Sequence, residues 1–97
     1  MAYRLSVKAE EDILRLYVEG ARLFGSNQAE KYYAGLGEIF QFLAETPRAA
    51  RERKEITPPV RIHPYGAHII VYLIDDGGDV LILRVRHGRE DWDGDPL

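Results

Sequence analysis

The sequence predicts an α+β fold in which a helical hairpin packs on an antiparallel β-sheet. Three features predict it: an alternating segment near the N-terminus, two successive segments of helical periodicity, and three strand-like segments in the second half. We expect the order β-α-α-β-β-β, with the last three strands forming a three-stranded antiparallel meander. Ninety-seven residues are enough for one domain and too few for two, so residues 1–97 are assigned to a single domain.

The first strand and the first helix are predicted within residues 3–24. Residues 3–7 alternate apolar and polar side chains, as a half-buried strand does. From Ala9 to Phe24 the apolar residues recur at helical spacing, and Gly25 is well placed to end the helix.

A second helix is expected to follow at once. Ser26 or Asn27 is the predicted side-chain cap, and Thr46-Pro47 ends the helix. Gly35 and Gly37 lie inside it, and each costs about 1 kcal/mol relative to alanine. We expect close packing against the first helix to offset this cost.

The second half of the chain is predicted to form the meander. A charged connection over residues 48–59 leads into strands at 60–63, 68–75 and 79–87, separated by turns at 64–66 and 76–78.

Strand parity decides which side chains share a face of the sheet. One face is purely aliphatic, with Val60, Ile62, Ala67, Ile69, Val71, Leu73, Leu81, Leu83 and Val85. We expect this face to pack against the helices. The arrangement requires Ile74 opposite Val80 and Tyr72 opposite Ile82, and therefore a three-residue loop with Gly78 in a left-handed bulge.

The second face keeps an apolar patch at one end and cationic side chains at the other, which is typical of an interaction site. Its predicted partner-binding residues are Arg61, His63, His68, Ile70, Tyr72, Ile74, Val80, Ile82, Arg84 and Arg86. A peptide that is apolar at one end and acidic at the other would suit this face. The alternative occupants are the C-terminus of the same chain or a second copy.

Composition excludes several classes of function. A net charge of −3 argues against binding nucleic acid mainly through phosphates, although the charges are segregated along the chain. The absence of cysteine excludes a disulfide framework and thiolate metal sites. No apolar run is long enough to span a membrane, and the N-terminus lacks the pattern of a secretory signal. We expect a cytoplasmic protein without cofactor or metal site.

One catalytic possibility stays open. Glu55, Arg61, Arg84 and His87 are the residue types that a ribonuclease needs for general acid–base catalysis and for charge stabilisation. Strand parity, however, sends His87 to the face opposite Arg84 unless the strand bulges, and Glu55 lies in a loop. We therefore expect no catalytic residues, with the endonuclease as the alternative. Arg84 and Arg86 either grip an anionic group or pair with the acidic tail at residues 90–95.

Four segments resemble the ParE/RelE toxins of bacterial toxin–antitoxin pairs, and the ParE branch in particular. They are Tyr3-Arg4-Leu5-Ser6 followed by Ala9 and Asp12, the helix end Thr46-Pro47, Gly66-Ala67-His68-Ile69-Ile70-Val71-Tyr72, and Val80-Leu81-Ile82-Leu83-Arg84-Val85-Arg86-His87-Gly88-Arg89-Glu90-Asp91-Trp92. The similarity covers nearly the whole chain, and the last segment is its most specific part.

The resemblance implies a toxin held inactive by a ParD-like antitoxin, a ribbon-helix-helix protein whose C-terminal segment wraps the toxin. ParE-branch toxins are associated with inhibition of DNA gyrase, whereas RelE-branch toxins cut mRNA on the ribosome. The acidic balance and the ending at residues 93–97 favour the ParE branch. The region that would contact the target then comprises Arg84, Arg86, His87, Arg89 and Trp92. A module that binds antitoxin without toxic activity is a further alternative.

Overall fold

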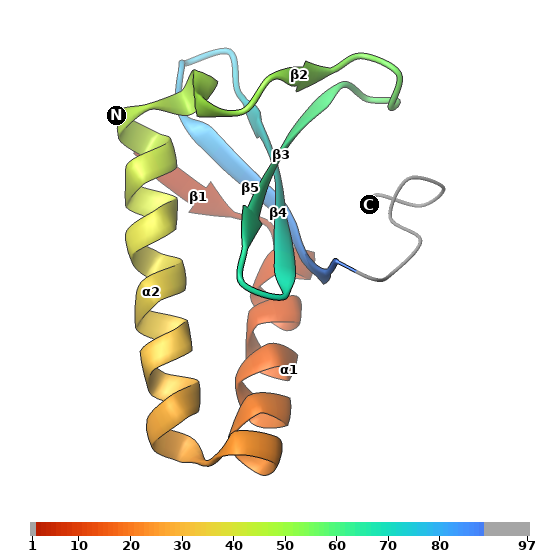
Figure 1. Ribbon diagram of the computed structural model, residues 1–97. Coiled ribbons are helices and arrows are strands. Elements are labelled where there is room, and N and C mark those ends of the chain that lie inside the picture. The colour runs from red at the N-terminus through yellow and green to blue at the C-terminus, as the bar shows by residue number, and fades with distance from the viewer. Residues whose placement is uncertain (1, 89–97) are drawn as a thin grey trace.

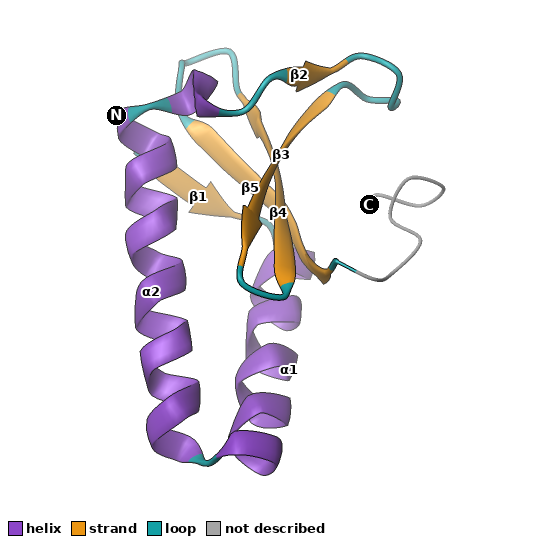
Figure 2. Ribbon diagram, viewed as in Figure 1, coloured by secondary structure: helices purple, strands orange, loops and turns teal. Residues whose placement is uncertain are grey.

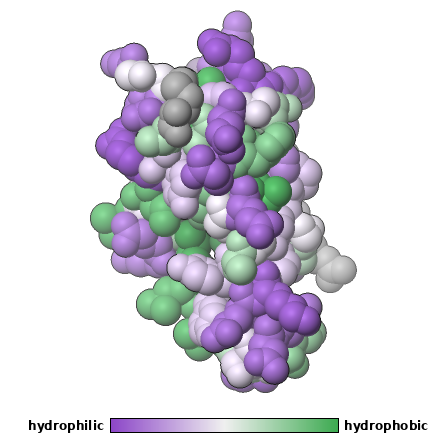
Figure 3. Space-filling model, turned by 90° about the vertical axis from the view of Figure 1, so that its left-hand side faces the viewer, coloured by the Kyte–Doolittle hydropathy of each residue, from purple (hydrophilic) through white to green (hydrophobic). Residues whose placement is uncertain are grey.

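The computed structural model describes residues 2–88, which form two helices against a twisted sheet (Figures 1 and 2). The elements are β1 (Tyr3–Leu5), α1 (Val7–Phe24), α2 (Ser26–Glu45), a 3-10 turn (Pro47–Ala49), β2 (Glu52–Arg53), β3 (Val60–Tyr65), β4 (His68–Ile74) and β5 (Val80–His87). Within this part of the chain, neither helix is long and apolar enough to cross a membrane. One side of the molecule is shown in Figure 3, where hydrophobic side chains gather mainly along the left-hand edge.

The sheet has five strands in the order β1-β5-β4-β3-β2, so the predicted three-stranded meander is only part of it. β1 runs parallel to β5, with Tyr3 beside Val80. After the helical hairpin the chain enters the sheet at the opposite edge, in β2, and the strands that follow return it to β1. β2 pairs only two residues with β3. It was missed because the charged segment around it has no alternating pattern.

The joint between the helices is a single residue, Gly25. Its φ of 90° and the hydrogen bond that its N–H donates to the Ala21 carbonyl end α1 as predicted. The predicted side-chain cap of α2 is wrong, because Gly25 occupies the cap position and no side chain bonds there. Ser6 caps α1 instead: its Oγ accepts a hydrogen bond from the Ala9 N–H and donates one to the Leu83 carbonyl.

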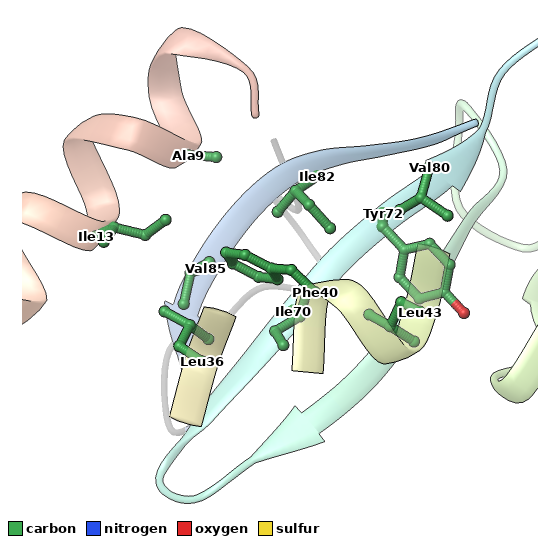
Figure 4. Close-up of a cluster of buried hydrophobic side chains, with 10 residues drawn as sticks. All are labelled: Ala9, Ile13, Leu36, Phe40, Leu43, Ile70, Tyr72, Val80, Ile82 and Val85. Atoms are coloured by element: carbon green, nitrogen blue, oxygen red, sulfur yellow. The ribbon is translucent and has the colours of Figure 1, made fainter. Parts of the chain in front are cut away.

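The main core lies between the helices and the sheet face that was predicted to bind a partner (Figure 4). The face assignment is therefore wrong: Ile70, Tyr72, Val80 and Ile82 are fully buried beneath the hairpin. Parity divides the residues into two sets but cannot tell which set meets the helices. The buried Tyr72 hydroxyl is accommodated there because it donates a hydrogen bond to the Pro47 carbonyl, at 2.8 Å.

The opposite face is also apolar, as the sequence indicated, and the chain covers part of it itself. Ile56, from the loop between β2 and β3, packs with Val60, Ile69 and Val71 in a second buried cluster. The loop thus covers part of this face of the sheet, and no pattern in the sequence indicated that it would.

The register of the last hairpin is confirmed. Tyr72 lies opposite Ile82, and the three-residue loop contains Gly78 at a φ of 87°. Further along β5, an irregularity leaves Leu83 without a direct partner: Val71 pairs with Arg84 and Tyr72 with Ile82. This bulge exchanges the faces of the residues that follow.

Two of the three glycines inside the helices lie close to another element, but only at Gly35 does packing leave no room for a side chain. A side chain at Gly20 would touch the Ala29 Cβ at 3.7 Å, and one at Gly35 would overlap the Tyr65 hydroxyl. Gly37 has no atom within 4 Å of an added Cβ. The predicted packing of Gly35 and Gly37 against the first helix is therefore wrong; Gly20 makes the helix–helix contact.

Candidate partner-binding groove beside the helical hairpin

The two helices extend beyond the edge of the sheet, toward the turn that joins them (Figure 1). This leaves a groove of about 870 Å³, here called the inner groove. Its helical wall is formed by Asp12, Arg15, Leu16, Glu19, Gly20, Leu23, Phe24, Gln28, Ala29 and Tyr32, and its sheet wall by Ala67, His68, Arg84, Val85 and His87.

The helical wall is largely apolar and unfilled. Leu16 lies on the side of α1 that packs on the core, and Leu23 continues that side past the end of the sheet. Leu23 is 56% exposed and Phe24 is 72% exposed. Two neighbouring large hydrophobic side chains exposed in a concavity are typical of a protein interaction site.

An ion pair fixes α1 to the sheet wall. The Asp12 carboxylate accepts hydrogen bonds from Arg84 Nε at 2.7 Å and from Arg84 Nη2 at 2.9 Å. It also accepts the Val85 N–H at 3.0 Å, on the edge of β5 where pairing with β1 has stopped. Asp12 thus replaces a neighbouring strand there, and the bidentate contact orients Arg84 along the groove.

Two tyrosines fix the tip of the β3–β4 hairpin to α2. The Tyr65 hydroxyl donates to the Tyr32 carbonyl, and the Tyr32 hydroxyl donates to the Tyr65 carbonyl, each at 2.9 Å. The Tyr32 oxygen also lies 2.7 Å from His68 Nδ1 and accepts the Ala67 N–H. Burial raises the pKa of both tyrosines above the ordinary value, so they stay neutral donors at physiological pH.

The sheet wall of the inner groove ends in two histidines. The His68 and His87 rings lie 5.4 Å apart in an edge-to-face arrangement. The bulge at Leu83 brings them together, because it moves His87 to the face that carries His68. The groove therefore combines exposed apolar side chains at the end of α1 with a sheet wall that carries two imidazoles and one paired guanidinium. Asp12, Arg15 and Glu19 add charges to the helical wall.

A sequence model of the ParE toxin of type II toxin–antitoxin systems matches residues 3–92. The chain belongs to the ParE toxin family. It is 31% identical to Toxin ParE1 of Mycobacterium tuberculosis over 91 residues, which cover 94% of this chain and 93% of that toxin. It is 28% identical to Toxin ParE1 of Caulobacter vibrioides over 85 residues, covering 88% and 86% of the two chains.

The fold is also that of a solved chain described as part of a chromosomal ParDE TA system from P. aeruginosa. The TM-score is 0.75 at 21% sequence identity, covering 90% of this chain and 95% of the other. The likeness shows the fold of this ParE-family chain. The placement of β1, which the sequence left open, is given by its parallel pairing with β5.

The structure brings some of the predicted partner-binding residues of this ParE-family chain into the inner groove and separates the others. His68, Arg84 and the predicted target-contact residue His87 line it together. The prediction that a partner contacts Ile70, Tyr72, Val80 and Ile82 is wrong, because these side chains are buried in the core. Ile74 lies opposite Val80 at the far end of the hairpin.

The remaining predicted residues lie elsewhere. Arg61 donates to the Ala50 carbonyl. The His63 ring packs against Phe42, and its buried Nδ1 has no hydrogen-bond partner within residues 2–88. Arg86 lies opposite Ile69, on the face away from the helices. Arg89 and Trp92 lie outside the described residues.

The four residues considered for ribonuclease catalysis do not form one site in the described structure. Glu55 pairs with Arg53 in the loop that precedes β3, and this contact holds the pKa of the Glu55 carboxyl below its usual value. Arg84 is on β5, with β4 between it and β3. The four residues therefore come from a loop and from two strands that are not neighbours in the sheet.

Sequence reasoning missed the helical wall of the inner groove in this ParE-family chain. Leu23 and Phe24 are adjacent hydrophobic residues at the C-terminal end of α1, where a helix usually meets solvent. This adjacent pair was the feature of the sequence that could have indicated an exposed binding surface. Nothing local in the sequence indicated that Asp12 pairs with the distant Arg84.

Proposed function

We propose that this chain is the toxin of a type II toxin–antitoxin pair and that a ParD-like antitoxin holds it inactive by filling the inner groove. The antitoxin would be a ribbon-helix-helix protein with a C-terminal segment that wraps the toxin. The observation that supports this seat is the exposed apolar wall at Leu23 and Phe24 beside the polar wall at His68 and His87. Membership of the ParE family supplies the class of partner.

The chemistry of the groove defines the segment that fits it. Apolar side chains at helical spacing would pack on Leu16, Leu23 and Phe24, and acidic side chains would face the imidazoles. Burying two exposed side chains of this size contributes about 1.5–3 kcal/mol each, which is enough for them to dominate the affinity.

The cellular target that we propose is DNA gyrase, reached through protein contact and without catalysis by the toxin. Family membership supports this target. The separation of Glu55 from Arg84 supports a non-catalytic mode of action.

Expression in bacteria tests the toxic role. Induction of the chain alone should arrest growth, and co-expression of the small protein encoded beside it should restore growth. Harmless expression of the chain together with tight antitoxin binding would contradict a toxic role and would leave only an antitoxin-binding module.

A purified system tests the target. Supercoiling by DNA gyrase should fall on addition of the chain, cleaved DNA complexes should accumulate, and the antitoxin should reverse both effects. Growth arrest with unimpaired gyrase and translation-dependent mRNA cleavage would contradict this target and would favour the endonuclease.

A further inference from the structure

A second groove lies between the helices on a different side of the hairpin, here called the outer groove. Leu14 and Tyr17 of α1, and Tyr33, Ala34 and Gly37 of α2, line its middle, and its volume is about 870 Å³. It shares no lining residue with the inner groove. Leu14 is 65% exposed and Tyr33 is 53% exposed.

Gly37 is the residue of this groove that internal packing does not explain. A glycine inside a helix is less favourable than alanine. Gly35 avoids an overlap with the Tyr65 hydroxyl, whereas a Cβ at Gly20 would make only ordinary contact with the Ala29 Cβ. An added Cβ at Gly37 would meet open space. A bare backbone on a groove floor permits the close approach of another helix, as small residues do in helix–helix contacts.

Among residues 2–88, the charged residues that line the outer groove are both acidic. Glu10 lies on α1 and Glu30 on α2, with the Tyr17 hydroxyl 3.4 Å from the Glu30 carboxylate. The Tyr17 and Tyr33 rings pack edge to face at 6.0 Å and form an aromatic wall beside these carboxylates. Carboxylates and aromatic faces together favour lysine and arginine side chains.

We infer that the outer groove binds an amphipathic helix of a partner protein whose small residues face Gly37 and whose basic residues reach Glu10 and Glu30. The inference does not depend on the proposed antitoxin seat, because the two grooves are lined by different residues.

A synthetic helical peptide of about 18 residues tests the chemistry of the groove; this length spans about 27 Å. It carries an alanine–leucine stripe flanked by lysines, and its matched control carries glutamates in place of the lysines. Fluorescence anisotropy with the full chain should show at least about tenfold tighter binding of the lysine peptide. Equal binding of the two peptides would overturn the proposal.

Two variants locate the binding site. Gly37→Leu should weaken binding of the lysine peptide by about tenfold or more, while the inner-groove control Leu23→Asp leaves it unchanged. Unchanged binding by Gly37→Leu would contradict the proposal. Gly37→Ala keeps the test independent of folding: it should raise the melting temperature, because alanine favours the helix, and should still weaken the peptide complex.

A second copy of the chain is the competing occupant. Sedimentation of the wild-type chain is expected to show a monomer at concentrations where the peptide binds. A dimer that Gly37→Leu converts to monomer would show that the outer groove is a self-interface and that the proposal is wrong.

Discussion

The carboxylate of Asp12 holds together a helix and a strand that are 72 residues apart in the chain. Its side chain is 5% exposed and that of Arg84 is 17% exposed, so neither charge is well solvated. Removing one partner of such a pair takes away the bidentate contact that offsets the cost of removing the other charge from water. Asp12→Ala should therefore lower the free energy of unfolding by about 3 kcal/mol or more, measured by urea denaturation.

The exposed ion pair between Arg4 and Asp75 is the control for the buried pair between Asp12 and Arg84. The Arg4 side chain is 63% exposed, so solvent screens the attraction. Arg4→Ala should change the free energy of unfolding by less than about 1 kcal/mol. If both variants lose the same stability, the pair between Asp12 and Arg84 does not hold α1 to the sheet.

Tyr72 makes the free energy of unfolding depend on pH in the alkaline range. Burial raises its pKa above the ordinary value, so the unfolded chain loses this proton at a lower pH than the folded chain. The contribution of the neutral hydroxyl is complete below about pH 10 and is lost as the pH rises through the folded pKa.

Tyr72→Phe tests this dependence. At pH 7 the variant should be less stable by about 1–2 kcal/mol, because the Pro47 carbonyl loses its donor. Between pH 9 and about 11 its free energy of unfolding should fall less steeply than that of the wild type. Identical slopes in urea titrations over this range would show that the hydroxyl ionises equally in both states.

At the scale of elements, Gly35 sets how closely α2 approaches the β3–β4 hairpin. An added Cβ would overlap the Tyr65 hydroxyl oxygen, so the hydroxyl must move and give up its hydrogen bond to the Tyr32 carbonyl. Gly35→Ala should destabilise the chain by about 1–2 kcal/mol, despite the better helix propensity of alanine.

A double-mutant cycle isolates this contact. In a Tyr65→Phe background the hydroxyl is absent, so Gly35→Ala should cost clearly less than in the wild type. Additive free energies would mean that the reciprocal tyrosine hydrogen bonds do not depend on the space at Gly35.

The elements with strong local patterns were predictable from sequence, and those set by distant contacts were not. Helical spacing located α1 and α2, and the odd length of the loop with Gly78 gave the correct pairing of Tyr72 with Ile82. The two-residue β2 has no pattern of its own. The bulge at Leu83 also has no local signature, because it is formed where Asp12 and Ser6 bind the edge of β5.

At the scale of the whole molecule, parity correctly indicated a sheet with hydrophobic residues on both faces. It could not decide which face the hairpin covers, because both sets contain enough hydrophobic residues to form a core. The position of the Tyr72 hydroxyl beneath the end of α2 distinguishes the two packings in three dimensions. The predicted site shared only its polar part, at His68 and Arg84, with the inner groove.

The part that sequence could not supply is the overhang of the hairpin beyond the sheet. It depends on the relative lengths and placement of the helices and strands, and it exposes Leu23 and Phe24 where helix periodicity alone would assign them to a core. The inner and outer grooves are lined by different residues, so the two binding roles that we propose for them are separable.

Antitoxin affinity for two α1 variants tests the central claim most directly. Leu23→Asp in the inner groove and Leu14→Asp in the outer groove alter side chains of similar exposure on the same helix, so their effects on folding should be similar and small. Calorimetric titration with the purified antitoxin should show at least about a tenfold loss of affinity for Leu23→Asp and little change for Leu14→Asp. The reverse order, with both variants folded, would contradict the assignment of the antitoxin to the inner groove.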